Sequence, residues 1–203
     1  MVNLNLIRHG KTLWNLDRRI QGREDIPLAE RGKAQVVSWC LPLGKISLDL
    51  VLSSPMVRAT QTAEIIGQRL GLGVIISENL REQDFGLWEG KRMADIRRAT
   101  PGLLEHQERL GWDFCPPGGE TRKEVLVRSL GALGQAAEEL KGLNLLVVTH
   151  SGVIRSLAYH ALGRFFLPWE KRVLKKEYLH EFVWSQGLTL KKLNAMDLNR
   201  GEG

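Results

Sequence analysis

The chain has 203 residues, 43% of them hydrophobic, and a formal net charge of +6 from 29 Lys and Arg against 23 Asp and Glu. This length and apolar content can form one sizeable core, so we expect a single domain over residues 1–203. The basic residues form no run of five and do not alternate with aromatic residues, which argues against nucleic-acid binding and favours a site for a small anion.

The cysteines and the N-terminus narrow the class of protein further. Cys40 and Cys115 lie far apart, with no CxxC pair and no histidine at metal-ligand spacing, so we expect neither a disulfide framework nor a metal site. No segment has the pattern of a signal peptide, and no apolar stretch approaches the roughly 18 residues needed to span a bilayer. We therefore expect a cytoplasmic protein, a monomer or homodimer, with no membrane partner.

Short apolar runs alternate with helical patterns along the chain. The strand-like runs lie at residues 3–7, 48–52, 73–77 and 143–149, and the helical patterns lie at residues 30–41, 57–70, 122–140 and from about 153 onward. Such alternation is typical of a parallel sheet with helices on both faces. We predict an α/β fold, specifically a three-layer α/β/α sandwich with a mostly parallel central sheet.

Three regions depart from this alternation. Residues 86–120 are rich in Pro and Gly, which predicts short helices and loops that form a lid-like insertion over the sheet. Residues 180–185 and 188–193 flank Gln186-Gly187, which predicts a tight hairpin or a pair of edge strands. Residues 194–203 are expected to form a loose tail.

Basic side chains follow two of the predicted buried strands. Arg8 and His9 come directly after the first strand, and His150 follows the strand at residues 143–149. The carboxyl ends of strands are where α/β proteins bind ligands. Arg58 lies in the first turn of a predicted helix, where backbone amides and the helix dipole favour an anion. The sequence therefore predicts an anion site at these strand ends.

Each of these groups has a chemical use beside a phosphate. A neutral His9 can attack phosphorus in line, while Arg8 and Arg58 can pair with the phosphoryl oxygens. His150 can donate a hydrogen bond to a phosphoryl oxygen. Glu82 lies beside apolar residues and is the candidate proton donor to the leaving alkoxide. Any one of these residues alone is more often structural, so the prediction rests on their joint pattern.

Several motifs, in order, resemble those of the histidine phosphatase superfamily, which has the phosphoglycerate-mutase-like fold. Residues 6–15 match its RHGxTxxN signature. Further matches follow in the same order, at Gln21-Gly22, residues 27–32, residues 53–63, residues 80–90 and Val148-Thr149-His150. The resemblance covers roughly residues 4–160.

This resemblance implies a reaction and a site. It implies that His9 is transiently phosphorylated, that Arg8, Arg58 and His150 hold the phosphoryl group, and that Glu82 protonates the leaving oxygen and then activates water. No metal and no cofactor would be required. It further implies that the phosphate or substrate is bordered by Thr12, Asn15, Gln21, Gly22 and the backbone amide of Ser151. A helix or turn cap remains an equal explanation of Asn15.

The segment around Glu82 bears on the type of phosphoryl transfer. The mutases of this family have Glu-Arg-His-Tyr-Gly and a long basic insertion, whereas this chain has Glu-Gln-Asp-Phe-Gly at residues 82–86 and is shorter. The missing arginine and the added Asp84 favour a phosphatase over a mutase. Together with the resemblance, they lead us to expect a metal-independent phosphomonoesterase that acts on a small phosphorylated metabolite. A mutase and a catalytically weak phosphate-binding module are the alternatives.

The insertion gives one indication of the substrate. Residues 116–121 and 84–90 are similar to stretches of the α-ribazole phosphatases of cobalamin synthesis. This similarity makes α-ribazole phosphate a candidate substrate. The Leu and aromatic residues of the insertion either line an apolar substrate face or pack the lid; they are Leu103, Leu104, Leu110, Trp112 and Phe114.

Overall fold

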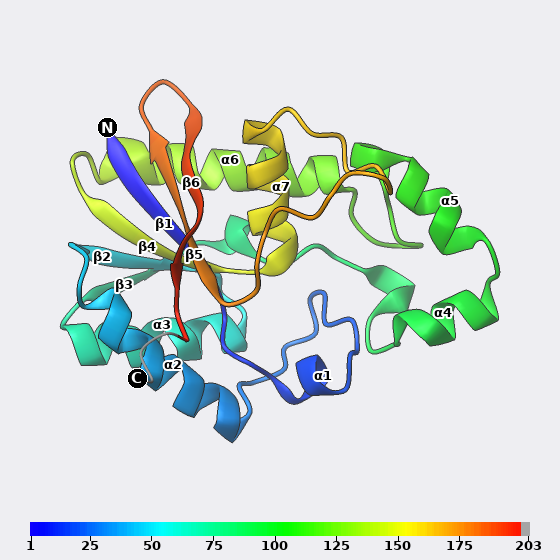
Figure 1. Ribbon diagram of the computed structural model, residues 1–203, viewed down its shortest axis with the longest axis horizontal. Coiled ribbons are helices and arrows are strands. Elements are labelled where there is room, and N and C mark those ends of the chain that lie inside the picture. Colours follow the sequence, from blue (N-terminus) through cyan, green and yellow to red (C-terminus); the bar gives the residue numbers. More distant parts are fainter. Residues whose placement is uncertain (200–203) are drawn as a thin grey trace.

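The computed structural model of the protein describes residues 1–199. Within these residues six strands form one sheet in the order β3-β2-β4-β1-β5-β6 (Figure 1). The parallel part consists of β1 (Val2–Arg8), β2 (Leu50–Ser53), β3 (Gly73–Ile76) and β4 (Asn144–Thr149). Antiparallel pairing then adds β5 (Tyr178–Trp184) and β6 (Leu188–Asp197) at one side.

Two pairs of helices cover the two faces of the sheet. One face packs against α2 (Glu30–Leu43) and α3 (Val57–Leu70). The opposite face packs against α6 (Arg122–Glu139) and α7 (Ser151–Ala161). The predicted α/β fold with three layers is therefore confirmed (Figure 1).

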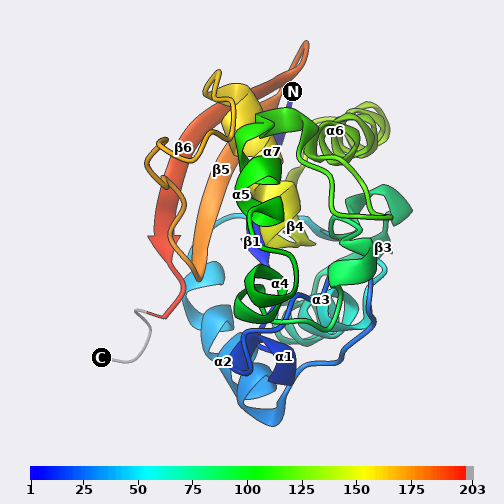
Figure 2. The same ribbon diagram turned by 90° about the vertical axis from the view of Figure 1, so that its right-hand side faces the viewer.

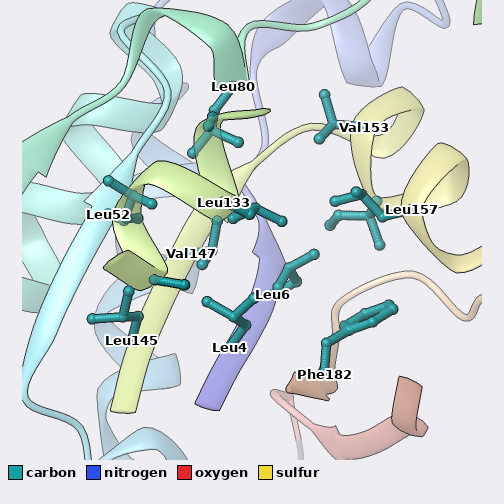
Figure 3. Close-up of a cluster of buried hydrophobic side chains, with 14 of the residues drawn as sticks. Leu4, Leu6, Leu52, Leu80, Leu133, Leu145, Val147, Val153, Leu157 and Phe182 are labelled. Carbon is teal, nitrogen blue, oxygen red and sulfur yellow. The ribbon is translucent and has the colours of Figure 1, made fainter. Parts of the chain in front are cut away.

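The alternation of side chains along the central strands explains the two cores. Leu4 and Leu6 of β1 and Val147 of β4 are fully buried on the face covered by α6 and α7 (Figure 3). Leu146 and Val148 are fully buried on the face covered by α2 and α3. Burial of each such side chain stabilises the fold by about 1.5–3 kcal/mol. The middle of the sheet is thus held from both sides, and the carboxyl ends of β1 and β4 are fixed.

Short helices occupy the segment between β3 and α6. It contains α4 (Met93–Ala99) and α5 (Leu103–Arg109), with 3-10 turns at Glu78–Leu80, Gly86–Trp88 and Gly111–Asp113. α4 and α5 lie beyond the carboxyl ends of β1 and β4, as does α1 (Leu13–Leu16) (Figures 1 and 2). A separate small core forms there from Trp88, Ile96, Leu104 and Phe114. The short helices expected in residues 86–120 are therefore present.

Several predicted bounds need correction. The helix predicted at residues 30–41 continues to Leu43, because Leu43 is fully buried and extends the apolar face beyond Pro42. The strand predicted at residues 48–52 begins at Leu50, where its pairing with Leu145 begins.

The predicted loose tail was wrong for its first residues. β6 continues to Asp197, which pairs with Tyr178 of β5, and Leu198 is buried. Pairing with β5 and apolar burial hold this end of the chain against the sheet. The remainder of the predicted tail, residues 200–203, lies outside the described residues. Among the helices of residues 1–199, none is long and apolar enough to cross a membrane.

Candidate active site

The parallel pairing of β1 with β4 places two histidines side by side. Arg8 is in register with Thr149, and the backbone amide of His9 donates to the carbonyl of Thr149 at 3.0 Å. The ring centroids of His9 and His150 lie 5.2 Å apart, and both side chains are buried. The structure thus brings together two residues that are 141 positions apart in the sequence, His9 and His150.

The surroundings of His9 favour a neutral ring with one free nitrogen. Nδ1 lies 2.7 Å from the carbonyl oxygen of Gly10, so the tautomer protonated at Nδ1 donates there and leaves the lone pair of Nε2 available. Burial, together with the positive charges of Arg8 and Arg58, holds the pKa of His9 well below its usual value. A neutral imidazole with a free Nε2 is the form that can act as a nucleophile.

His150 has the complementary arrangement. Its Nε2 lies 2.7 Å from Oγ of Ser54, while its Nδ1 is buried with no hydrogen-bond partner among the described residues. Burial and the charge of Arg58 hold the pKa of His150 well below its usual value. When the Ser54 hydroxyl donates to Nε2, the neutral ring carries its proton on Nδ1 and can donate to a ligand.

Arg58 is the second residue of α3, so it lies in the first turn of the helix, as predicted. Its Nη1 donates to the carbonyl of Glu24 at 2.7 Å and its Nη2 to that of Gly22 at 2.8 Å, whereas Nε is buried without a partner. Gly22 has φ +53°, a left-handed conformation that favours glycine and turns its carbonyl group toward the arginine. These two bonds fix the guanidinium group in one orientation.

The start of α3 is capped by a residue from outside the helix. The N-cap is Met56, and the carboxylate of Asp25 accepts the amide of Val57 at 2.6 Å. Ser54 instead contacts His150. The sequence pattern located the helix but did not identify Ser54 as a residue of the site.

Arg8 completes a set of unpartnered donors. Its Nε is buried with no partner in the described part of the chain, like Nε of Arg58 and Nδ1 of His150. The charges of Arg8 and Arg58 act on both histidines, which places these groups in one electrostatic cluster. Each buried donor without a partner costs about 1–3 kcal/mol. An anion held beside His9 would provide all three with acceptors.

Glu82 lies near this cluster, because its charge acts on both Arg8 and Arg58. Its carboxylate accepts the backbone amides of Gln83 at 2.9 Å and of Gly152 at 3.1 Å. A Cβ at position 152 would lie 2.3 Å from Oε1 of Glu82, so any larger residue there would displace the carboxylate. The surroundings of Glu82 are mixed: Leu104 and Phe114 line the same cavity, but amides at the start of α7 and the charges of Arg8 and Arg58 also act on its carboxylate.

Arg128 supports the backbone around Glu82 and was not predicted from the sequence. From α6, its Nη1 donates to the carbonyls of Asn79 and Arg81, both at 2.7 Å, and its Nη2 to that of Glu82 at 3.1 Å. Its Nε forms an ion pair with Glu120 at 2.7 Å. Arg128 therefore orients the segment that carries Glu82.

Three of the predicted substrate-binding residues bind one another. Thr12 is the N-cap of α1: its hydroxyl accepts the amide of Asn15, and the side chain of Asn15 accepts the amide of Thr12. The Thr12 hydroxyl also lies 3.0 Å from Oε1 of Gln21. Asn15 therefore caps the start of α1 together with Thr12. Asn15 also lines a cavity beside His9, and its contact with substrate stays a prediction.

Two cavities open on the cluster. One, of about 320 Å³, is lined by Arg8, His9 and Asn15. The other, of about 290 Å³, is lined by Glu82 and the exposed Ser151 and extends under α5 to Leu104 and Phe114. Within residues 1–199 no group of three or more His, Cys, Asp or Glu side chains has a geometry that could hold a metal ion.

Comparison with known proteins identifies the class of protein. The model of the histidine phosphatase superfamily (branch 1) matches residues 4–195. The chain belongs to this superfamily, as the motifs around His9 and His150 indicated. Solved structures of phosphoglycerate-mutase-like histidine phosphatases share its fold.

Similar proteins include both phosphatases and mutases by name. A probable phosphoglycerate mutase of Salmonella choleraesuis is 33% identical over 176 residues, which cover 86% of this chain and 80% of that protein. The structure of Bacillus stearothermophilus YhfR matches with a TM-score of 0.87 at 28% identity, over all of both chains. A phosphoserine phosphatase from Entamoeba histolytica, in complex with 3-phosphoglyceric acid, matches with a TM-score of 0.82 at 26% identity, over 98% of this chain and 99% of that one.

Proposed function

We propose that the protein is a metal-independent phosphomonoesterase that hydrolyses a small phosphorylated metabolite through a phosphohistidine at His9. The observation that carries this proposal is the set of three unpartnered buried donors, on Arg8, Arg58 and His150, around a neutral His9. Donors placed in advance where charge develops are the main source of catalysis in phosphoryl transfer. Membership of the superfamily supports the same chemistry.

In the first step, Nε2 of His9 attacks phosphorus and the bond from phosphorus to the ester oxygen breaks. Glu82, in its protonated form, transfers its proton to the leaving oxygen, so the alcohol departs neutral. Arg8, Arg58 and Nδ1 of His150 bind the phosphoryl oxygens through their unpartnered donors. The products of this step are the alcohol, the phosphohistidine and the Glu82 carboxylate.

In the second step, the Glu82 carboxylate takes a proton from water while the water oxygen attacks phosphorus. The bond from phosphorus to nitrogen breaks and inorganic phosphate leaves. His9 is again neutral and Glu82 is again protonated, so the cycle is closed. The amide bonds from Gln83 and Gly152 hold the carboxylate in place through both roles.

The substrate is open within this proposal. The names of similar proteins include a glucosyl-3-phosphoglycerate phosphatase and a phosphoserine phosphatase. The similarity of residues 116–121 to α-ribazole phosphatases makes α-ribazole phosphate a further candidate. We also propose that residues 86–120 cover the bound substrate. Location in the cytoplasm and the choice between monomer and homodimer stay predictions from the sequence.

Mutase activity is the second candidate function, because relatives with about one third identity are named probable phosphoglycerate mutases. A mutase must keep the intermediate bound until the phosphoryl group returns to another oxygen. A phosphatase only needs water to reach the phosphohistidine. The ratio of isomerised product to released phosphate therefore separates these two functions.

The test is turnover of a panel of phosphomonoesters in excess EDTA, with His9→Ala as control. The panel contains α-ribazole phosphate, phosphoserine, 3-phosphoglycerate and p-nitrophenyl phosphate. We expect phosphate release that survives EDTA and disappears in His9→Ala. Isomerisation without release would favour the mutase, and wild-type activity in His9→Ala would reject a phosphohistidine. Binding of phosphate with no turnover of any ester would favour a binding module.

A further inference from the structure

The side chain of Glu89 joins two segments of the site that are far apart in the sequence. Its Oε1 accepts the backbone amide of Arg23 at 2.7 Å and that of Phe85 at 3.1 Å. Arg23 belongs to the loop at residues 20–24, which follows α1, and Phe85 lies three residues after Glu82. One carboxylate oxygen therefore holds this loop against the segment that carries the proposed proton donor.

Backbone bonds hold the same loop to the residues that follow Glu89. The amide of Gly90 donates to the carbonyl of Ile20 at 2.9 Å, and the amide of Ile20 donates to the carbonyl of Lys91 at 2.9 Å. The loop accordingly lies beside the segment that leads into α4 (Figures 1 and 2). Glu89 extends this contact from Ile20 to Arg23, because its bond is made to the backbone of the loop.

The peptide unit bound by Glu89 is the one that orients Arg58. Its N–H group belongs to Arg23 and donates to Glu89, and its carbonyl group belongs to Gly22 and accepts Nη2 of Arg58 at 2.8 Å. The peptide unit is planar, so a bond that fixes its N–H direction also fixes the direction of its carbonyl group. A chain of two hydrogen bonds thus runs from Glu89 through one peptide unit to the guanidinium group.

Gly22 allows the carboxylate to lie directly against this peptide unit. A Cβ at position 22 would clash with Oε1, Cδ and Cγ of Glu89. Gly22 also has φ +53°, a conformation that side chains other than glycine rarely adopt. The glycine of the Gln21-Gly22 motif therefore serves the contact with Glu89 as well as the turn of the loop.

The charge of Glu89 acts on Arg58 in addition. Burial lowers the pKa of Arg58, and nearby carboxylates, Glu82 first among them and Glu89 also, oppose this shift. Within residues 1–199 no lysine, arginine or histidine forms an ion pair with Glu89. The carboxylate is therefore available to favour the charged form of the arginine that it helps to orient.

We propose that Glu89 is a positioning residue for the reaction: through the peptide unit between Gly22 and Arg23, it holds the Arg58 guanidinium group in the orientation that meets the phosphoryl group. This inference rests on the proposed function, in which Arg58 binds the phosphoryl oxygens. Removal of the carboxylate leaves the amides of Arg23 and Phe85 without their acceptor, so the loop can shift. A shift of about 1 Å at a catalytic group costs about 10²-fold in rate.

The first experiment measures kcat/KM for phosphate release from glycerol 1-phosphate and from p-nitrophenyl phosphate. In Glu89→Ala both values should fall by a similar factor, about 10- to 100-fold, because Arg58 acts on the phosphoryl group that the two esters share. Glu89→Gln keeps an accepting oxygen at the same reach and should restore most of the activity. Equal losses in Glu89→Gln and Glu89→Ala would overturn the inference. A loss confined to glycerol 1-phosphate would also overturn it, because Glu89 would then act through Glu82.

The second experiment asks whether Glu89 acts through Arg58. When Glu89→Ala is added to Arg58→Ala, kcat/KM for p-nitrophenyl phosphate should fall by less than about threefold further, because the group that Glu89 positions is already absent. Two residues that act independently would instead give the same loss in both backgrounds. A further loss as large as that in the wild-type background would therefore overturn the inference.

Asp49→Ala is the matched control for a general loss of stability. Oδ2 of Asp49 accepts two N–H groups of Asn144, the backbone amide at 2.7 Å and the side-chain amide at 3.1 Å. This contact lies at the amino ends of β2 and β4, opposite to the strand ends beside His9. Asp49→Ala should lower the free energy of unfolding in urea and keep the wild-type kcat/KM. A loss of kcat/KM like that of Glu89→Ala would trace both effects to stability and overturn the inference.

Calorimetric titration with inorganic phosphate separates failure of this inference from failure of the phosphatase proposal. The Kd for phosphate does not depend on turnover, and it should rise about tenfold or more in Glu89→Ala and return toward the wild-type value in Glu89→Gln. This result would support the inference even when the wild-type protein releases no phosphate from any ester. Wild-type Kd and wild-type kcat/KM in Glu89→Ala would reject the inference and leave the phosphatase proposal intact.

Discussion

The two sides of the cleft over His9 are built in different ways. On one side, backbone pairing of β1 with β4 places His9 and His150 directly after the ends of two central strands that are buried on both faces. On the leaving-group side, Glu82 lies in an irregular segment that depends on side-chain contacts such as those of Arg128. In the proposed reaction, the constant phosphoryl group thus meets residues placed by paired central strands, whereas the variable alcohol meets an irregular segment, and irregular segments tolerate change.

The largest loss of kcat/KM should come from a substitution on the side of His9 and His150, and this loss should be the same for different leaving groups. Arg58→Ala removes a guanidinium group that we propose binds the phosphoryl oxygens, and losses from such arginines reach about 10³-fold or more. We expect a similar loss of kcat/KM for glycerol 1-phosphate and for p-nitrophenyl phosphate. Arg69→Ala, an exposed arginine in the last turn of the same helix, is the control. A loss confined to one ester would contradict this role.

The next effect should come from Glu82 and should depend on the leaving group. Glu82→Gln keeps the size of the side chain but removes the proton, and general acid catalysis contributes about 10²- to 10⁴-fold. We expect a loss in this range with glycerol 1-phosphate and a much smaller loss with p-nitrophenyl phosphate, whose leaving group needs no proton. Equal losses with both esters would show that Glu82 is not the proton donor.

The same contrast explains how much of the site the sequence could predict. His9 and His150 follow short apolar runs, and such runs are a local signal of buried strands. Arg58 was predictable because the pattern at residues 57–70 locates α3 correctly. The predicted roles of the catalytic residues rest on the family motifs and await the experiments above.

The residues that the sequence did not indicate act through long-range side-chain contacts. Arg128 reaches the carbonyl groups of residues 46 to 49 positions earlier, and Ser54 binds a histidine 96 positions later. Neither contact leaves a periodic pattern, because the first depends on how α6 packs and the second on how the ends of β2 and β4 align in the sheet. The end of β6 was missed for a related reason, since its pairing with β5 holds a segment whose own residues read as a tail.

A moderate loss of kcat/KM should follow when a methyl group is added at Gly152, whose amide binds Glu82. Gly152→Ala places Cβ about where Oε1 of Glu82 lies, at 2.3 Å, so the carboxylate must move. We expect kcat/KM for glycerol 1-phosphate to fall about 10- to 100-fold, since misplacement of a catalytic group by about 1 Å has costs of this order. The free energy of unfolding, measured in urea, should change by less than about 1 kcal/mol, because alanine is favoured over glycine in a helix.

A matched glycine controls for the helix effect. Gly131 lies in α6, and a Cβ there meets no atom within 4 Å. Gly131→Ala should raise the free energy of unfolding by about 0.5–1 kcal/mol and keep the wild-type kcat/KM. Wild-type activity in Gly152→Ala, with Glu82→Gln inactive, would show that the precise place of the carboxylate is unimportant.

The smallest expected effect is on the free energy of unfolding rather than on kcat/KM, and it comes from His180. His180 of β5 is buried, and burial lowers its pKa to about 4, below the value of about 6.5 in an unfolded chain. Between these two values the unfolded chain binds more protons than the folded protein. Stability from this group is therefore complete above about pH 6.5 and is lost as the pH falls toward 4, by about 2 kcal/mol at pH 5.

Urea unfolding at pH 7 and pH 5 measures this loss, with His180→Asn as the comparison. Nδ1 of His180 accepts the amide of Asn194 at 3.1 Å, and the side-chain oxygen of asparagine can accept the same bond without a titrating ring. The variant should lose less stability than the wild-type protein between the two pH values. His9 and His150 titrate in the same direction and remain in both proteins, so they cancel in the difference. Equal losses in the two proteins would mean that His180 is as readily protonated in the folded protein as in the unfolded chain. Burial in β5 would then not lower the pKa of a histidine, in contrast to burial at His9.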